Sequence, residues 1–375
     1  MALPEFTGIA HNCSSFHLAY PDPSTHLLTI VLSLFYYSFL FVLGLIGNLY
    51  IIILTLRHKS LQTVQNLFIL NLAAADVILC VLSVPITPLT NIYKQWYFGA
   101  NLCNIFGGLQ AIAVFISTYS LCAISLDRYY RLVIKPQNNL TRRHAITATI
   151  LIWTFSIALT LPYVTHMELQ KYPGICGEFC TERWEDESQR KLYTLTLLIL
   201  QAVVPFIIMA LSYSAIFRSL HSRATSRILS IQQQVNLLCM LASTAGNAVT
   251  NDPTKINQLV QQKEKIIGQK KKITIILVSM VMIFALSSLP LNVISLVTEL
   301  EGDLGFLSMA DGTNLTYLCS LVVHALAMVV CLSNPLLYSF LNPEFREMVI
   351  KSLNCIPKTL NMGGPSMYYS QTEFV

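Results

Sequence analysis

The chain has 375 residues, of which 54% are hydrophobic and only 11% are charged, against about 25% in soluble domains. This composition excludes an ordinary soluble globular domain and indicates a protein that crosses a membrane several times. The net charge of +5 comes from basic residues between the apolar stretches, so it implies membrane lipids as neighbours and requires no nucleic-acid partner.

Seven stretches are long and apolar enough to cross a bilayer, which takes about 20 helical residues. Six contain no acidic or basic residue, and the seventh contains only Asp76. In chain order the seven are residues 27–56, 60–93, 95–126, 145–165, 192–217, 273–298 and 312–343. We therefore predict an all-α membrane protein, a bundle of seven transmembrane helices within residues 27–342.

One further uncharged stretch, residues 228–251, is interrupted by polar residues, and only residues 237–242 are continuously apolar. Six residues are too short to span a bilayer. We assign this stretch to a long cytoplasmic loop at about residues 221–269, which can include an amphipathic helix. The alternative is an eighth span, which would place the C-terminus outside.

Charge predicts the orientation of the bundle. Basic residues follow the first span and flank the later ones on one side, among them Arg57, Arg142, Arg143, Arg223 and Lys263, whereas the opposite connections are acidic or mixed. The positive-inside rule then places the N-terminal segment, residues 1–26, outside. Asn12 and Asn314 begin glycosylation sequons on the predicted outer side. Residues 1–26 lack the apolar core of a cleavable signal, so the first span is expected to be the anchor.

The third span carries polar residues at regular spacing. Cys103, Gln110, Ser117 and Arg128 are separated by 7, 7 and 11 residues. At 100° per residue these steps return to within about 20° of one helix face. One stripe thus joins an outer cysteine, an amide, a mid-membrane hydroxyl and an arginine at the inner end. A single buried hydroxyl is common, so Ser117 alone would carry little weight.

Almost every span holds one residue that is costly in hydrocarbon. They are Asn48, Asp76, Arg128, Trp153, Pro205, Pro290, Asn334 and Pro335. Together with Asp127-Arg128-Tyr129 and Asn334-Pro335-Leu336-Leu337-Tyr338, this pattern resembles the rhodopsin-like (class A) G-protein-coupled receptors over roughly residues 28–355. The resemblance implies a multi-pass plasma-membrane receptor with an extracellular N-terminus, coupled to a heterotrimeric G protein and bound by arrestin.

The resemblance also implies the residues of the activation switch. They are Asp127, Arg128, Tyr129, Tyr213, Phe284, Pro290, Asn334, Pro335 and Tyr338. Asp127 is expected to hold Arg128 in the resting state, and a G-protein segment or Tyr213 to replace it in the active state. An arginine that merely reaches the interface is the alternative for Arg128 alone. Ser288 departs from the family, which usually has tryptophan there, so we expect a working switch with an altered trigger.

Asp76, Ser117 and Asn334 match three contributors to the sodium pocket of this class. A buried carboxylate either becomes neutral or finds a partner, and a hydrated sodium ion is one such partner. Ala113 and Val330 stand where many relatives have polar side chains, so the alternative is a protonated Asp76 that makes hydrogen bonds. No other cofactor is expected.

Several cysteines have roles implied by the family. Cys180-Thr181-Glu182-Arg183-Trp184 resembles the family's Cys-x-Glu-x-Trp pattern, which implies a Cys103–Cys180 disulfide. Cys176 then pairs with Cys13 or stays free. A short amphipathic helix is expected at residues 343–355, before a cytoplasmic tail at 356–375, and Cys355 at its end is a palmitoylation candidate.

The ligand class follows partly by elimination. Gln110 stands where aminergic receptors have a carboxylate, and Met328 where opsins have a lysine. Gln110, His324 and the segment Phe340–Arg346 resemble the neuropeptide Y, prolactin-releasing-peptide and RFamide receptor group. This likeness implies an extracellular, C-terminally amidated peptide ligand and favours Gi/o. The expected ligand-binding residues are Gln110, Ser288, Glu299, His324 and Glu182.

Two alternatives remain. One is a receptor for a different non-aminergic ligand. The other is a transporter or channel in which Asp76 and Arg128 would be relay or gating charges, although the chain shows no internal repeat of the kind that transporters have. No metal-ligand spacing, nucleophile elbow or phosphate loop indicates an enzyme.

Overall fold

The computed structural model describes residues 13–15, 22–134, 141–244, 253–301, 315–341 and 347, with some side chains of these segments excepted. The expected helix at 343–355, Cys355, the tail at 356–375 and the sequon asparagines Asn12 and Asn314 lie outside the described residues. The chain divides into two compact units, Met1–Pro335 and Leu336–Val375. The helical bundle belongs to the first unit.

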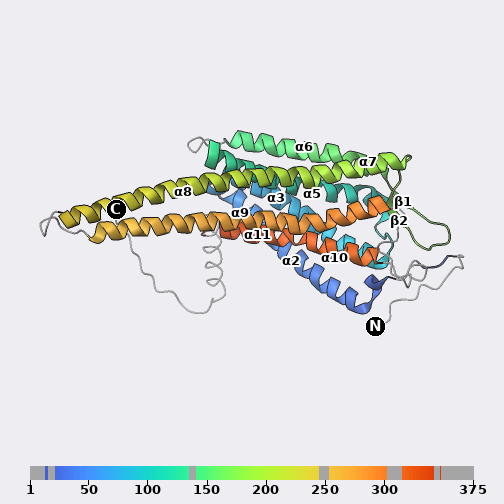
Figure 1. The fold of residues 1–375 in the computed structure, drawn as a ribbon. Helices are drawn as coiled ribbons and strands as arrows, with labels where there is room; N and C mark the ends of the chain where they lie inside the picture. The colour runs from blue at the N-terminus through green and yellow to red at the C-terminus, as the bar shows by residue number, and fades with distance from the viewer. Residues whose placement is uncertain are drawn as a thin grey trace, which may run out of the picture. The chain divides into compact units, whose positions relative to one another are not determined.

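Helices make up nearly all of the described chain (Figure 1). In chain order the elements are η1 (Pro23–Thr25), α2 (Leu27–Arg57), η2 (Lys59–Leu61), α3 (Val64–Val81), α4 (Ser83–Tyr93), α5 (Gly99–Tyr129), η3 (Tyr130–Ile134), α6 (Arg142–His166), β1 (Met167–Gln170), β2 (Phe179–Glu182), α7 (Glu187–Leu198), η4 (Ile199–Val203), α8 (Val204–Thr244), α9 (Pro253–Glu301), α10 (Thr316–Met328) and α11 (Val330–Leu341).

Six helical stretches among the described residues are long and apolar enough to cross a membrane. They are Leu27–Arg57, Val64–Tyr93, Gly99–Ile134, Arg142–His166, Glu187–Leu237 and Thr316–Leu336. The remaining predicted span, residues 273–298, lies within α9, where Ala285–Thr298 forms a shorter apolar helical segment. The predicted fold class, an all-α helical membrane bundle, is confirmed.

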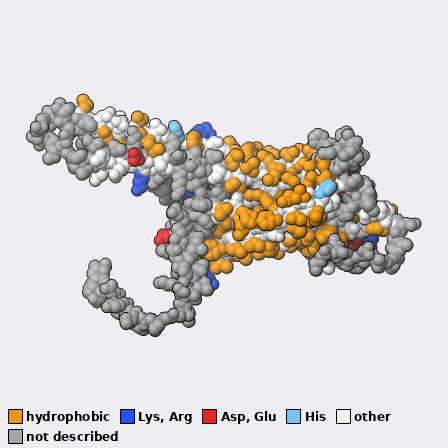
Figure 2. All heavy atoms as spheres, turned by 90° about the horizontal axis from the view of Figure 1, so that it is seen from below, with side chains coloured by type: hydrophobic (Ala, Val, Ile, Leu, Met, Phe, Trp, Pro, Cys, Tyr) orange, Lys and Arg blue, Asp and Glu red, His pale blue; other side chains and the backbone are white. Residues whose placement is uncertain are grey.

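The outer surface of the bundle is apolar. Figure 2 shows hydrophobic side chains covering the visible side of the bundle, with charged side chains toward its ends. Phe35 is 76% exposed and Leu151 62% exposed, and many other large apolar residues are similarly bare. Soluble monomers rarely expose apolar patches above a few hundred Å². This surface is therefore the one that faces lipid.

The core brings α2, α3, α5, α10 and α11 together around small residues. A side chain at Gly44 would place its Cβ 2.9 Å from Cys80 Sγ and 3.4 Å from Cys331 Cβ, so this close approach requires glycine. Asn48 Nδ2 donates to the carbonyls of Gly44, at 2.9 Å, and Cys331, at 2.8 Å. The side-chain amide of Asn48, which is costly to bury in hydrocarbon when unpaired, thus forms a hydrogen-bonded link between α2 and α11.

Pro205 explains an irregular turn between α7 and α8. Proline lacks a backbone N–H and its ring displaces the preceding turn, so the helix widens to a π-turn at η4. The carbonyl of Leu200, inside this turn, accepts a hydrogen bond from the Tyr119 hydroxyl at 2.8 Å. The same turn carries Gln201.

A β-hairpin and two disulfides mark one end of the bundle. β1 and β2 are antiparallel, with Leu169 opposite Cys180. Cys180 is joined to Cys103 at the start of α5, the pairing implied by the family pattern. Cys176, in the loop between the strands, is joined to Cys13, which was one of its two expected alternatives. The bond ties the N-terminal segment to this hairpin.

Long helices form the segment at the other end of the bundle, where a loop that can include an amphipathic helix was expected. The described residues between 221 and 269 are helical: α8 continues to Thr244 and α9 begins at Pro253. These helices contact one another, and Figure 1 shows them extending beyond α3 and α5. Good helix formers such as Leu, Gln, Lys and Met are frequent here, and no proline falls between residues 206 and 252, so no proline interrupts α8 after Pro205.

Candidate functional site

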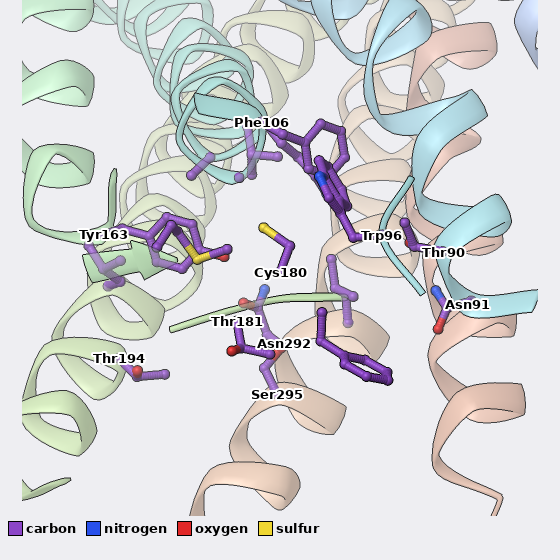
Figure 3. Close-up of a pocket in the computed structure, with 18 of the residues that line it drawn as sticks. Thr90, Asn91, Trp96, Phe106, Tyr163, Cys180, Thr181, Thr194, Asn292 and Ser295 are labelled. Atoms are coloured by element: carbon purple, nitrogen blue, oxygen red, sulfur yellow. The ribbon is translucent and has the colours of Figure 1, made fainter. Parts of the chain in front are cut away.

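A cavity of about 540 Å³ opens at the hairpin end of the bundle, within the usual range for ligand pockets. Its walls come from α4, α5, α6, α7, α9 and α10, with the hairpin across them. Figure 3 shows side chains from these elements surrounding one space. Its non-aromatic polar and charged lining residues are Thr90, Asn91, Lys94, Gln95, Gln110, Thr181, Thr194, Gln201, Asn292 and Ser295.

The hairpin is fixed as part of the cavity wall. Phe179, Cys180 and Thr181 of β2 all line the cavity, and the Cys103–Cys180 disulfide holds β2 to the first turns of α5. Trp96 adds a second tie, because its backbone N–H donates to the Glu178 carbonyl at 2.7 Å. The rim of the cavity is therefore built from a cross-linked strand and not from a free loop.

The polar lining includes the amide side chains of Asn91, Gln95, Gln110, Gln201 and Asn292. Asn292 Nδ2 donates to the Ser288 carbonyl at 2.8 Å, and Asn91 Nδ2 donates to the Thr87 carbonyl at 3.1 Å. Each bond holds an amide in place and leaves its side-chain oxygen available as an acceptor. Lys94 is the one charged residue among the described lining residues. Such a wall suits a ligand rich in amide groups.

Of the expected ligand-binding residues with described side chains, Gln110 lines the cavity, whereas Ser288, Glu182 and His324 do not. Ser288 is half-buried on α9, and its backbone carbonyl accepts a hydrogen bond from Asn292 Nδ2. Ser288 itself is not among the described residues that line the cavity. Glu182 accepts a hydrogen bond from Trp184 Nε1 at 2.8 Å and is also outside that lining. The side chain of Glu299 is not among those described.

His324 lies within the helix packing. Its Nδ1 is 2.9 Å from the Tyr37 hydroxyl and its Nε2 is 2.8 Å from the Ser83 hydroxyl. The residue is 2% exposed. Both ring nitrogens are thus engaged in contacts that join α2, α4 and α10, and none of the described cavity lining comes from His324. Its position is interhelical.

Most other lining residues were not foreseen from the sequence, among them Lys94, Tyr163, Gln201, Asn292 and Tyr317. One local signal existed: Gln201 lies four residues before Pro205, where a proline distorts the preceding turn. The others depend on which helix face turns inward, which spacing along a fully apolar span leaves undetermined.

Mid-membrane, Asp76, Ser117 and Asn334 come together as expected. Ser117 Oγ donates to Asp76 Oδ1 at 3.2 Å, and Asn334 Nδ2 donates to Asp76 Oδ2 at 2.8 Å. Asp76 is completely buried. Carboxylate and hydroxyl oxygens are ligands suited to hard cations, so Asp76 and Ser117 fit a sodium ion that water completes. Asn334 directs its N–H groups at the carboxylate and contributes no oxygen in this arrangement.

At the opposite end of α5, Asp127 is 2% exposed and accepts a hydrogen bond from Arg131 Nε at 2.9 Å. Arg128 interacts electrostatically with both Asp127 and the buried Tyr213. Pro290 lies inside α9, and Asn334 and Pro335 are buried in α11. The side chains of Phe284 and Tyr338 are not among those that the structure describes. Tyr129 is half-buried at the end of α5.

Comparison with known proteins adds two findings. Residues 47–338 match the family described as 7 transmembrane receptor (rhodopsin family). Over 350 residues the chain is 41% identical to the neuropeptide receptor npr-1 of Caenorhabditis elegans, covering 91% of this chain and 76% of that protein. It is 30% identical to the neuropeptide F receptor of Drosophila melanogaster, covering 83% and 60%, and 27% identical to the neuropeptide Y receptor type 6 of Oryctolagus cuniculus, covering 88% and 82%.

Proposed function

Because the chain belongs to the rhodopsin family of seven-transmembrane receptors, we propose that it is activated by an amidated neuropeptide and signals through Gi/o. The observation that carries the peptide assignment is the cavity of about 540 Å³, whose described lining contains several amides and no carboxylate. The three similar proteins named above are all neuropeptide receptors, which agrees with a peptide ligand.

Gln110 is the residue that we assign to the amidated end of the peptide. A carboxamide both donates and accepts hydrogen bonds, and a glutamine side chain offers the matching pair. A carboxylate only accepts, so the free acid would leave one group of Gln110 without a match. Gln201 and Asn292 line the same cavity and can bind backbone amides of the peptide.

The cavity end is assigned to the outside of the cell. Both disulfides lie at this end, and disulfides persist in oxidising, extracellular surroundings. Basic residues such as Arg142, Arg143 and Arg223 belong to the other end, in agreement with positive-inside logic. The N-terminus is then extracellular, and the α8–α9 end is where a G protein and arrestin would bind.

Glu299 is the proposed partner for an arginine in the peptide. It lies near the end of α9, nine residues beyond Pro290. A carboxylate–guanidinium pair is charge-assisted and can be bidentate, and losing one desolvated partner costs about 2–5 kcal/mol. A solvated rim charge would contribute under about 1 kcal/mol. The two cases differ enough to be separated by a mutant series.

The test is a screen of amidated peptides on cells that express the chain, with dissociation of Gi/o subunits as the readout. Active peptides would then be tested in a crossed swap, in which Glu299→Arg meets peptides with Arg or Glu at the penultimate position. We expect the charge-reversed peptide to regain potency on the reversed receptor. If no amidated peptide activates Gi/o while the receptor is at the cell surface, the proposed function is wrong.

A further inference from the structure

The N-terminal segment is anchored at two places beside the cavity. The first anchor is the Cys13–Cys176 disulfide, supported by backbone bonds from Ser14 N–H to the Gly174 carbonyl and from Cys176 N–H to the Ser14 carbonyl, each 3.0 Å. The second is the short turn η1, whose N-cap residue Asp22 is 6% exposed and whose Ser24 is fully buried. A segment with a covalent tether stays at high effective concentration near its second contact.

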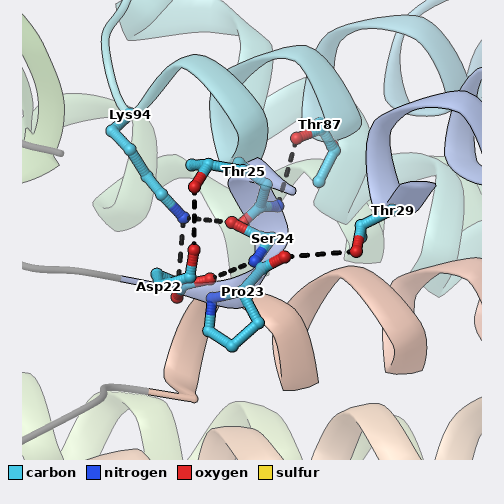
Figure 4. Close-up of polar contacts among 8 residues, drawn as sticks. Asp22, Pro23, Ser24, Thr25, Thr29, Thr87 and Lys94 are labelled. Atoms are coloured by element: carbon cyan, nitrogen blue, oxygen red, sulfur yellow. Dashed lines mark hydrogen bonds and ion pairs between the residues drawn. The ribbon is translucent and has the colours of Figure 1, made fainter. Parts of the chain in front are cut away.

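Asp22 and Lys94 form that second contact (Figure 4). Lys94 Nζ lies 3.6 Å from Asp22 Oδ2, and both side chains are almost completely shielded from solvent. The same ammonium donates to Ser24 Oγ at 2.7 Å and lies 3.5 Å from the centre of the Tyr317 ring. Asp22 Oδ1 accepts from the Ser24 N–H, whereas Oδ2 has no hydrogen-bond partner among the described residues.

The backbone of Lys94 also indicates that this lysine has a specific role. Its φ of 57° lies in the left-handed region, and it is the one non-glycine residue with positive φ in the described part of the chain. It ends α4, where glycine or asparagine would be less strained. Strained residues that persist are commonly tied to function. Here the strained residue is also the charged residue of the cavity wall.

We propose that Asp22 and Lys94 form a specificity-determining charge pair in the cavity wall. Through this pair, the N-terminal segment selects the charge of the ligand that binds at this wall. Asp22 neutralises Lys94, so the wall made by α4 and α10 accepts a cationic peptide. Without Asp22, the ammonium of the protonated Lys94 would have no counter-charge beside Tyr317, and the wall would then favour an anionic ligand. The identity of that peptide rests on the proposed function; the charge of the wall does not.

The ligand-dependent test compares Asp22→Asn, Lys94→Met and the double variant. The probes are an amidated peptide ending in Arg-Phe-NH2 and its counterpart with Gln for Arg. At about 10 Å and an effective dielectric constant of about 20, one uncompensated charge changes cation affinity by roughly tenfold. We expect Asp22→Asn to weaken the arginine peptide by that factor, to leave the glutamine peptide nearly unchanged, and to be rescued by Lys94→Met. An equal loss for both peptides, or no loss, would overturn the proposal.

A second test needs no peptide and remains valid if the proposed ligand is wrong. Asn91 lines the cavity on the same helix, so Asn91→Cys provides a thiol close to the pair. Its reaction rates with a cationic and an anionic methanethiosulfonate reagent report the local potential, with the receptor lacking this cysteine as background. We expect Asp22→Asn to shift the rate ratio about tenfold toward the anionic reagent. An unchanged ratio would show that Asp22 does not set the charge of the wall.

Discussion

The carboxylate of Asp127 is hydrogen-bonded to Arg131 at 2.9 Å, one helical turn away, and not to the adjacent Arg128. The expected resting contact between Asp127 and Arg128 is therefore electrostatic in this structure. Arg128 lies toward Tyr213 of α8, in the part of the molecule that we assign to the G protein. Its availability does not require Asp127 to release a hydrogen bond.

Replacing Arg128 by alanine should abolish agonist-stimulated nucleotide exchange on Gα while the receptor still reaches the cell surface. The reason is that Arg128 is the half-buried cation that interacts electrostatically with both Asp127 and Tyr213. Arg131→Ala is the matched control, since the Arg131 side chain is partly exposed and we expect activation to persist. Undiminished exchange by the Arg128 variant would refute its assignment to coupling.

Sodium should act through Asp76. If Asp76 and Ser117 hold the ion, replacing sodium by choline will raise agonist affinity in the parent receptor, because the ion stabilises the resting arrangement with Asn334. Asp76→Asn should be insensitive to this exchange, and Ser117→Ala should respond less than the parent. A parent receptor that ignores sodium would favour the alternative of a protonated Asp76 held by its two hydrogen bonds.

Ser288→Trp should alter the response to agonist. Ser288 is half-buried two residues before Pro290, and an indole there adds large volume to a packed helix face. Overpacking typically costs about 1–3 kcal/mol, so we expect a change of roughly tenfold in potency or a shift in basal activity. Leu286→Trp is the control, because Leu286 is 63% exposed on the lipid side. If both variants match the parent, Ser288 has no part in the switch.

The charge pair predicts a pH dependence of binding. Burial lowers the pKa of Lys94 to about 8, against the opposing effect of Asp22, and Tyr317 is the other titratable group in contact with the ammonium. Raising the pH from 7 to 9 therefore removes the lysine proton and leaves the Asp22 carboxylate uncompensated. Affinity for an arginine peptide should rise over this interval. Lys94→Met should lose the dependence, and a variant that keeps it would locate the titrating group elsewhere.

Site residues that match a family motif could be predicted from the sequence. Asp76, Ser117 and Asn334 were grouped in advance because they match the sodium pocket of the family, and Cys180 was assigned to Cys103 by its sequence pattern. Pairings between distant residues that match no family motif were not predictable. Asp22 and Lys94 are far apart in sequence, and neither stands in a recognisable motif, so only the packing of η1 beside α4 brings them together.

The sequence also did not determine which face of each helix points into the cavity. His324 was expected in the cavity, yet its ring is bonded to Tyr37 and Ser83 within the packing. In a span that is apolar on all sides, periodicity does not distinguish a cavity-facing residue from an interhelical one. The loop at about residues 221–269 was expected to include an amphipathic helix, but the length of α8 and α9 was not predicted, because low apolar content argues against a span and says little about how far a helix continues.

The most direct measurement is the affinity of one active peptide prepared as the C-terminal amide and as the free acid. We predict that the amide binds at least about tenfold more tightly, because a mismatched buried polar group costs about 1–3 kcal/mol. Gln110→Leu should abolish this preference, whereas Gln201→Leu, which removes another amide of the same cavity, should retain it. Equal affinity of amide and acid for the parent receptor, or an unchanged preference in Gln110→Leu, would contradict the account.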